Sequence, residues 1–279
     1  MKLAFSTLAC PDWTWGEIQA TAVDLGYDGI ELRGLNREYL LPASPYFSAD
    51  NLELTKKHLE NLGIQISSLT TGSLLQIEDQ EKKEGYIKDA IAYIKLAAAL
   101  GVKYVRVLGD THPEPGIEVR DQLVRDALME LGDCAIDHHV YVLIETNGAY
   151  TDSRRLSRLL EELSHPAVGV LWDCHHTYRF GRESFQETWD ILKEHIKYLH
   201  LKDSVLENGK IRYRLFGEGD LPLTELLLLL QEEYQGWLSL EWVKAWEPEL
   251  EEPSLAIPHF IDAFRRLQRK AKRQSKDQE

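Results

Sequence analysis

Cysteine is scarce in this 279-residue sequence: Cys10, Cys134 and Cys174 lie far apart and form no CxxC pair. This scarcity argues against a disulfide framework and indicates a reducing cytosol. Long apolar runs are missing as well. The apolar stretch before Asp12 is too short for a signal peptide, and no window approaches the length of a membrane span. We therefore expect a cytoplasmic protein that has no membrane partner.

Basic charge is also scarce, except at the C-terminal end. The net charge is −14, but residues 265–276 contain seven lysines or arginines and no acid. Residues 1–264 therefore carry 25 positive and 44 negative side chains, a net charge of −19. A body this acidic is unsuited to following a nucleic-acid backbone, so we expect no nucleic-acid partner. Residues 265–279 are predicted to be the basic end of the last helix and a tail.

A glycine-rich phosphate-binding fingerprint is missing after the first predicted strand, which argues against a dinucleotide-binding fold. The sequence instead repeats a strand pattern followed by a helix pattern eight times. The predicted strands cover residues 3–7, 28–33, 64–69, 103–108, 140–145, 168–173, 196–201 and 237–241. The predicted helices cover residues 14–25, 49–62, 81–100, 119–138, 153–163, 184–195, 223–234 and 255–273. This alternation, with no linker to divide it, predicts an α/β fold: a single (β/α)8 TIM barrel over residues 1–279.

Residues of the types that bind metals stand at the carboxyl ends of four consecutive predicted strands. They are Glu145, Asp173, His200 and Glu241, at intervals of 28, 27 and 41 residues. The active site of such a barrel forms at the carboxyl ends of its strands, so we expect these side chains to meet there. Three carboxylates and one imidazole suit a divalent ion such as Mn2+, Mg2+ or Co2+, and Zn2+ is an alternative. The competing interpretation is that each acid is simply a solvated strand end.

Six motifs, in this order, resemble the xylose isomerase-like TIM barrels, which include sugar isomerases, ketose 3-epimerases, inosose dehydratases and endonuclease IV. The motifs are GYDGIELR (26–33), VLIETN (142–147), WDCHH (172–176), HLKD (200–203), FGEGDL (216–221) and LSLEW (238–242). The resemblance implies that Glu145, Asp173, His200 and Glu241 bind one divalent ion. It also implies that His176 faces the substrate or a second metal.

Two departures separate the chain from endonuclease IV-like enzymes, which hold three metals. Where those enzymes have an Asp-x-His pair, this chain has Ile211, Arg212 and Tyr213. Where they have a histidine after the third strand, this chain reads Thr-Thr-Gly-Ser at residues 70–73. The ligands of a third metal are therefore missing, and DNA repair is the least favoured alternative.

Further residues are predicted around the metal. Glu31 and Arg33 end the second strand and are candidates for binding a sugar hydroxyl or an acid group, with an ion pair at the barrel mouth as the alternative. Lys202 is a candidate substrate contact, with a salt bridge to Asp203 as the alternative. Arg212 and Arg214, beside Glu218, either bind a phosphate or belong to a solvated hairpin. Trp13, Trp15 and Trp242 either offer apolar walls to a sugar or pack in the core. His112 is a candidate for a role in its loop, whereas structural or surface roles are predicted for His138, His139, His165 and His195.

The predicted function is a metal-dependent sugar isomerase or epimerase acting on a small keto-sugar, polyol or sugar phosphate. Proton abstraction would pass through a metal-stabilised enediolate. Glu145 and Glu241 are the predicted catalytic residues: acting on opposite faces they epimerise, and one acting alone isomerises. The alternatives are an inosose dehydratase-like lyase, with His176 or Lys202 as the acid, and a non-catalytic binding module. The sequence is compatible with a homodimer and leaves the oligomeric state and the sugar open.

Overall fold

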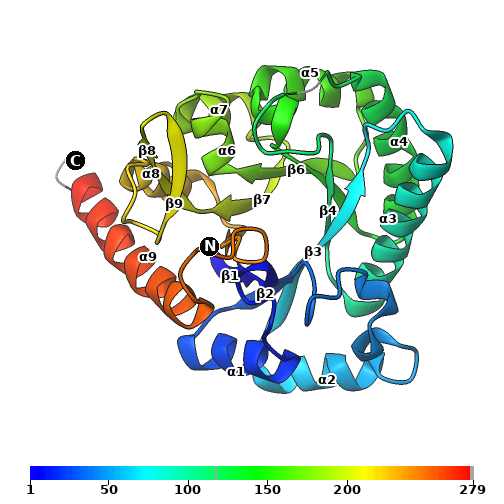
Figure 1. Cartoon of the computed structure of the whole chain (residues 1–279), viewed down its shortest axis with the longest axis horizontal. Helices are drawn as coiled ribbons and strands as arrows, with labels where there is room; N and C mark the ends of the chain where they lie inside the picture. The colour runs from blue at the N-terminus through cyan, green and yellow to red at the C-terminus, as the bar shows by residue number, and fades with distance from the viewer. Residues whose placement is uncertain (117, 277–279) are drawn as a thin grey trace.

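The structure is a computed structural model that describes residues 1–116 and 118–276. Within these residues, eight parallel strands close into a barrel in the order β1-β10-β7-β6-β5-β4-β3-β2, with helices around it (Figure 1). The predicted (β/α)8 TIM barrel is therefore confirmed. The strands are β1 (Lys2–Ser6), β2 (Gly29–Leu32), β3 (Gln65–Leu74), β4 (Tyr104–Leu108), β5 (Tyr141–Glu145), β6 (Val168–Asp173), β7 (Ile196–Leu201) and β10 (Trp237–Leu240).

The helices that cover the barrel begin and end where local sequence signals lie. Thr14 and Glu17 form a capping box at the start of α1. The first three long helices end at Gly26, Gly63 and Gly101, whose φ values of 69°, 69° and 72° suit glycine. The helices are α1 (Trp15–Leu25), α2 (Leu52–Leu62), α3 (Gln80–Leu100), α4 (Asp121–Asp137), α5 (Ser153–Leu163), α7 (Phe185–Leu192), α8 (Leu223–Glu233) and α9 (Pro253–Lys276).

Helix α9 contains most of the predicted basic end, and residues 277–279 of the predicted tail lie outside the described residues. In the described part of the chain, no helix is both long and apolar enough to span a membrane.

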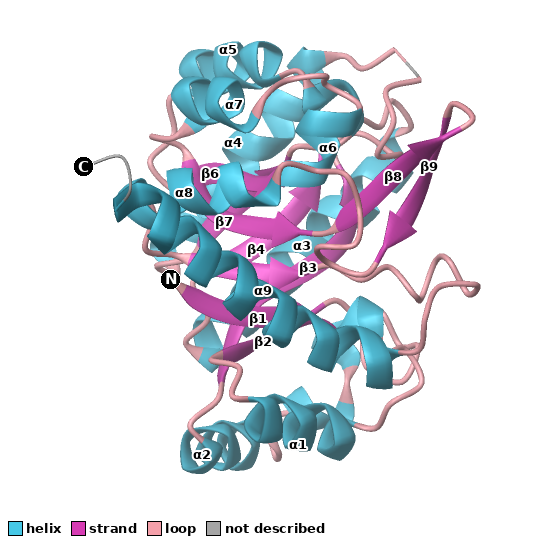
Figure 2. Ribbon diagram, turned by 90° about the vertical axis from the view of Figure 1, so that its left-hand side faces the viewer, coloured by secondary structure: helices cyan, strands magenta, loops and turns pink. Residues whose placement is uncertain are grey.

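Shorter elements lie at the carboxyl ends of the strands. Helix α6 (Cys174–Arg179) follows β6 directly, and a hairpin of β8 (Asp203–Glu207) and β9 (Lys210–Arg214) projects from the side toward which the strands point (Figure 2). Arg212 and Arg214 pair with Glu207 at 3.2 and 2.7 Å, so the solvated-hairpin interpretation of these arginines is confirmed. The remaining short elements are η1 (Thr7–Ala9), η2 (Leu41–Ala43), η3 (Pro45–Phe47) and η4 (Gly148–Thr151).

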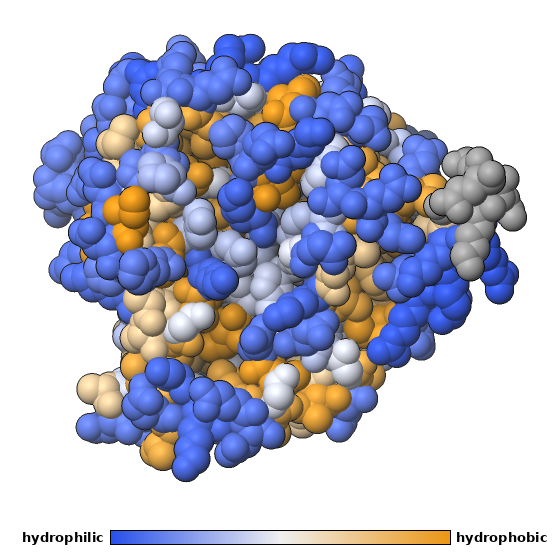
Figure 3. Space-filling model, turned by 180° about the vertical axis from the view of Figure 1, so that it is seen from behind, coloured by the Kyte–Doolittle hydropathy of each residue, from blue (hydrophilic) through white to orange (hydrophobic). Residues whose placement is uncertain are grey.

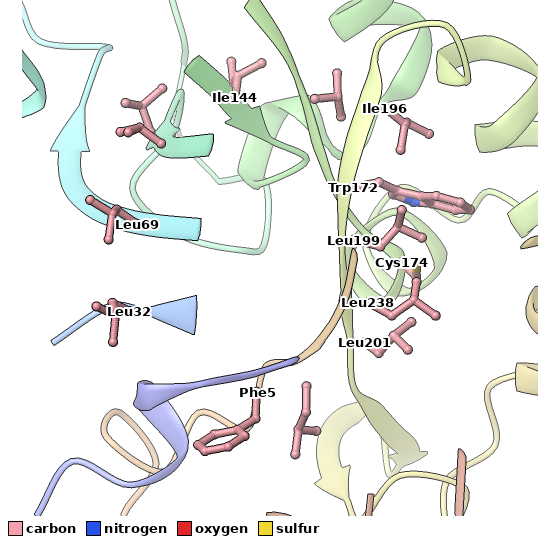
Figure 4. Close-up of a cluster of buried hydrophobic side chains, with 14 of the residues drawn as sticks. Phe5, Leu32, Leu69, Ile144, Trp172, Cys174, Ile196, Leu199, Leu201 and Leu238 are labelled. Atoms are coloured by element: carbon pink, nitrogen blue, oxygen red, sulfur yellow. The ribbon is translucent and has the colours of Figure 1, made fainter. Parts of the chain in front are cut away.

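Side chains alternate between the two faces of each strand, and the outward-facing ones form the main core beneath the helices. Leu199 and Leu201 of β7 lie in this core with Trp172 of β6 and Phe5 of β1 (Figure 4). The helices turn their other faces to solvent: the view from behind shows mainly hydrophilic residues with smaller apolar areas between them (Figure 3). The inward-facing side chains of the strands therefore lie apart from this main core.

Aromatic side chains fill the amino-terminal half of the barrel interior. The rings of Tyr104 and Tyr198 lie 5.9 Å apart, and those of Tyr104 and Tyr141 lie 6.2 Å apart. Trp237 belongs to the same cluster, and the Tyr198 hydroxyl lies 2.8 Å from Oγ of buried Ser67. We call Tyr104, Tyr141, Tyr198 and Trp237 the aromatic plug. In the alternating pattern, the next inward positions toward the carboxyl ends are two residues further along each strand.

Candidate metal centre and cavity

Ionisable side chains converge at the carboxyl ends of the strands, three from strand ends and one, His176, from helix α6. One ligand atom each from Glu145, Asp173, His176 and Glu241 lies within 4.8 Å of the others, and all four residues are buried. Nδ1 of His200 faces the same group. It lies 3.3 Å from Oε1 of Glu241 and 3.8 Å from carboxylate oxygens of Glu145 and Asp173. The structure thus brings together the four predicted strand ends, together with His176.

His200 is oriented by a residue from the other side of the barrel. Its Nε2 lies 3.0 Å from Oε2 of Glu31, so this nitrogen donates its proton to the carboxylate, and Nδ1 is an acceptor whenever the ring is neutral. Burial lowers the pKa of His200, but the carboxylates of Glu31 and Glu241 outweigh it and raise the pKa well above its usual value. The protein without a metal therefore holds His200 as a cation.

His176 approaches the group from helix α6. Asp173 caps this helix by accepting the His176 backbone N–H at 2.9 Å, which brings the His176 ring back over Asp173. Nδ1 lies 3.1 Å from the carbonyl oxygen of Thr146, and Nε2 lies 3.6 Å from Oδ2 of Asp173. Burial is the main cause that lowers the pKa of His176. Its position suits contact with either a metal or a substrate.

Two buried cations balance the carboxylates. Nε of Arg106 lies 3.0 Å from Oε2 of Glu145, and its Nη1 donates to the carbonyl of Thr71 at 2.8 Å. Burial raises the pKa of Glu145, but Arg106 and His200 outweigh it and lower the pKa to about 2. Nζ of Lys202 lies 2.7 Å from Oδ2 of Asp173 and also contacts Glu241.

The predicted alternative for Lys202, a salt bridge to Asp203, is wrong. Asp203 instead accepts the backbone N–H groups of Gly217 and Gly219 at 3.0 and 2.9 Å, so it holds the turn after the hairpin. Lys202 is therefore directed to the carboxylates of the site rather than to the loop. Burial lowers the pKa of Lys202, but the Asp173 and Glu241 carboxylates raise it well above its usual value.

The donor set fits a divalent ion. In the described part of the chain, Nε2 of His176 and Nδ1 of His200 are buried without a hydrogen-bond partner. Such polar atoms are costly to bury unless something satisfies them. Three carboxylates and imidazole nitrogens that point at one place are the ligands that Mn2+, Co2+ or Zn2+ accepts.

A cavity of about 390 Å³ leads to this group, a size in the usual range for a small-molecule site. Glu31 lies behind His200 and does not line the cavity. A larger cavity of about 530 Å³ lies at the amino-terminal ends of the strands, between residues such as Lys2, Gln65 and Trp237, away from the metal-type ligands. The smaller cavity is lined by Arg33, Arg106, Glu145, His176, Lys202, Tyr213, Glu241, Trp246 and Glu247, with Leu8, Leu108, Thr111, Pro113, Asn147 and Val243.

The cavity residues that were not predicted as site residues include Arg106, Tyr213 and Trp246. Arg106 had a signal, since it stands between Val105 and Val107 in a strand and must face the barrel interior. Tyr213 and Trp246 lie in the hairpin and in the loop after β10, where no periodic pattern reports their direction.

The predicted alternatives for the other aromatic residues and histidines are resolved as follows. Trp15 and Trp242 are buried in the core and Trp13 packs against it, as their packing interpretation expected. His112 lines a neighbouring cavity rather than the one described above. His165 and His195 line a separate cavity beside Tyr141 and Lys197, away from the metal-type ligands.

Residues 19–267 match the model of a family described as xylose isomerase-like TIM barrel. The chain belongs to the xylose isomerase-like TIM barrel family. The resemblance inferred from the six motifs is confirmed. None of the curated proteins compared with this sequence matches it.

Several solved structures share the fold over nearly the whole chain. An L-ribulose 3-epimerase has a TM-score of 0.80 at 14% identity, covering 99% of this chain and 97% of that one. The IOLI protein with a binding zinc atom has a TM-score of 0.79 at 18% identity, covering 97% and 99%. The probable 3-DHS dehydratase AsbF from Bacillus anthracis has a TM-score of 0.74 at 17% identity, covering 95% and 98%. At these identities the likeness shows the fold alone.

Proposed function

We propose that this member of the xylose isomerase-like TIM barrel family is a divalent-metal-dependent isomerase or epimerase of a small carbohydrate. The observation that carries the proposal is the convergence of Glu145, Asp173, Glu241 and Nδ1 of His200 at one end of the 390 Å³ cavity. Similar structures include an L-ribulose 3-epimerase and a protein with a bound zinc atom, which supports both the reaction and the metal.

Glu145, Asp173, His200 and Glu241 are the residues that would hold the ion, and Mn2+ is the first candidate. When bound, the ion would supply Lewis-acid polarisation of a substrate carbonyl and its neighbouring hydroxyl. Glu31 fixes the ring of His200 so that Nδ1 is directed to the other ligands. His176 would then contact the substrate through Nε2, which is directed toward the same point.

Glu145 and Glu241 are the proposed proton-transfer groups. Their strands β5 and β10 are separated in the barrel by β6 and β7, so the two carboxylates reach the cavity from different sides. Epimerisation follows if one carboxylate removes the proton on the carbon beside the carbonyl and the other returns a proton to the opposite face. Aldose–ketose isomerisation follows if the proton returns to the neighbouring carbon. Arg106 positions Glu145 by pairing with its Oε2.

A lyase is the second candidate, because Lys202 lines the cavity and its ammonium contacts Glu241. Removal of a proton by Glu241 and protonation of a departing β-hydroxyl by Lys202 or His176 would give a dehydration. A probable dehydratase is among the structures that share the fold. The carboxylates that abstract the proton would be the same in both reactions, so the product distinguishes them.

The test is to incubate Mn2+-loaded protein in D2O with a panel of ketoses, aldoses and inososes. Deuterium at one carbon of a recovered isomer or epimer is the expected result, and a dehydrated product would favour the lyase. Glu241→Gln should reduce the exchange rate about 100-fold or more, since it removes a proton-transfer group. Glu249→Gln removes an exposed carboxylate from the loop after β10 and serves as the matched control. Turnover without any deuterium in the product would contradict the proposed proton abstraction.

A further inference from the structure

Arg33 is a cation at the wall of the cavity. It follows β2 two positions after Glu31, and its backbone N–H donates to Oγ1 of Thr7 at 3.0 Å. Its guanidinium carbon lies 5.1 Å from the ring centre of Tyr39 and 5.7 Å from that of Trp246. The two rings, 5.1 Å apart, therefore hold the guanidinium group at the cavity wall.

The guanidinium group has an unused donor. In the described part of the chain, no carboxylate lies within ion-pair distance of Arg33, and its Nη1 is buried without a hydrogen-bond partner. Arg37, four residues later, shows the contrast: its Nη2 donates to Oδ2 of Asp12 at 2.7 Å. Burial and the nearby charge of Arg106 lower the pKa of Arg33 to about 10. A buried guanidinium beside a second one is costly unless an anion joins them.

The buried charges of the site also favour an anion. Four buried carboxylates, those of Glu31, Glu145, Asp173 and Glu241, face three cationic side chains, those of Arg33, Arg106 and Lys202. With a divalent ion bound and His200 neutral as its ligand, these buried charges sum to one positive charge. A neutral sugar would leave that charge uncompensated, a single carboxylate would cancel it, and a phosphate dianion would exceed it.

The shape around Arg33 also favours a carboxylate. Tyr39 and Trp246 contact the guanidinium, and Leu8 and Val243 add apolar wall, so hydrogen bonding is left to the donors of the guanidinium edge. The edge of a guanidinium matches the two oxygens of a carboxylate in a bidentate pair. From these observations we infer that the substrate is a sugar acid, a polyhydroxy keto compound with one carboxylate that Arg33 binds. The inference rests on the proposed function, because the metal centre would hold the carbonyl end of the same molecule.

The test compares three compounds with one carbon skeleton: D-fructose, D-fructuronate and D-fructose 6-phosphate. Binding of each to Mn2+-loaded protein is measured by calorimetry, and deuterium exchange is measured in parallel. D-fructuronate is expected to bind roughly 10- to 100-fold more tightly than D-fructose, the gain of a charge-assisted bidentate pair. Arg33→Met should bring this ratio close to one, and Arg33→Lys should leave an intermediate ratio. Arg37→Met, an exposed arginine of the same loop, should retain the full ratio.

Each outcome bears on the carboxylate site separately from the reaction. Equal binding of D-fructose and D-fructuronate, tightest binding of D-fructose 6-phosphate, failure of D-fructuronate to bind, or a ratio that Arg33→Met does not change would each overturn the inference. Arg33-dependent binding of D-fructuronate without deuterium exchange would support the carboxylate site and contradict the proposed proton transfer. Mn2+ titration of each variant verifies that the metal centre is intact.

Discussion

Nε2 of His200 and Oε2 of Glu31 lie 3.0 Å apart, although the two residues are 169 positions apart in the sequence. Both side chains are buried on the inner face of the barrel. This hydrogen bond selects the tautomer of His200 and turns Nδ1 toward Glu145, Asp173 and Glu241. Glu31 was predicted as a candidate substrate contact. The structure instead places it outside the cavity lining, in contact with His200, a proposed metal ligand.

Glu31→Gln is therefore expected to weaken Mn2+ binding about 10- to 100-fold, because loss of a carboxylate partner makes a ligating imidazole less basic and less well oriented. Mn2+ titration of the purified variant measures the effect, with thermal unfolding as the test of its folding. Glu38→Gln, an exposed change a few residues later in the chain, is the matched control. Unaltered Mn2+ affinity in Glu31→Gln would contradict this role of the Glu31 carboxylate.

His176 and His200 are expected to respond differently to truncation. His176→Ala should leave metal affinity within about tenfold while activity falls roughly a hundredfold or more. His200→Ala should lose the metal, because it removes a direct ligand. Metal titration and exchange rate are measured side by side for each variant. Equal loss of the ion from both variants would make His176 a primary ligand, a role its Nε2 is positioned to take.

The ionisation of Glu145 should appear in the acid stability of the metal-free protein. Its pKa is lowered from 4.5 to about 2 in the folded state, so its contribution to stability is complete above pH 4.5 and is lost as the pH falls toward 2. The difference in free energy of unfolding between the wild type and Glu145→Gln should therefore narrow over this interval. Urea unfolding at a series of pH values measures it. A difference that stays constant between pH 4.5 and 2 would contradict the lowered pKa.

Duplex DNA with an abasic site is expected to be neither bound tightly nor cleaved. The hydroxyls of Thr70 and Thr71 donate to the backbone carbonyls of Leu32 and Arg106, and Tyr213 lines the cavity from β9. The body of the chain also has a net charge of −19. Incubation of Mn2+-loaded protein with such DNA, with a dedicated repair enzyme as the positive control, tests this. Metal-dependent nicking at a comparable rate would show the prediction to be wrong.

The fold and the proposed ligands could be predicted because their signals are local. Strand and helix patterns follow the chain, and the residue that ends a strand of a parallel barrel has a known location. The face of the strand on which each side chain lies could also be predicted: Tyr198 and His200 share a face because they are two residues apart. The same rule would have directed Arg106 inward, two positions after Tyr104.

The partners of these residues could not be predicted, since closure of the barrel determines them. Glu31 meets His200 only because β2 and β7 face one another across the barrel interior. Lys202 pairs with Asp173 and Glu241 instead of its sequence neighbour Asp203, because Asp203 accepts backbone N–H groups from a turn. Trp246 reaches Arg33 from the loop after the last strand. Each of these contacts joins segments whose sequences show no mutual pattern.

The aromatic plug determines how molecules enter and leave the site. The ring of Tyr198 lies 6.1 Å from that of His200, so the plug lies directly beneath the metal-type ligands and separates them from the cavity at the amino-terminal ends. In the described part of the chain, the mouth at the carboxyl ends is thus the route by which both substrate and product exchange with solvent. A product that stays bound in the mouth excludes the next substrate, so product inhibition should be competitive. The rate of product release should depend on the loop residues at the mouth and not on the residues beneath the metal.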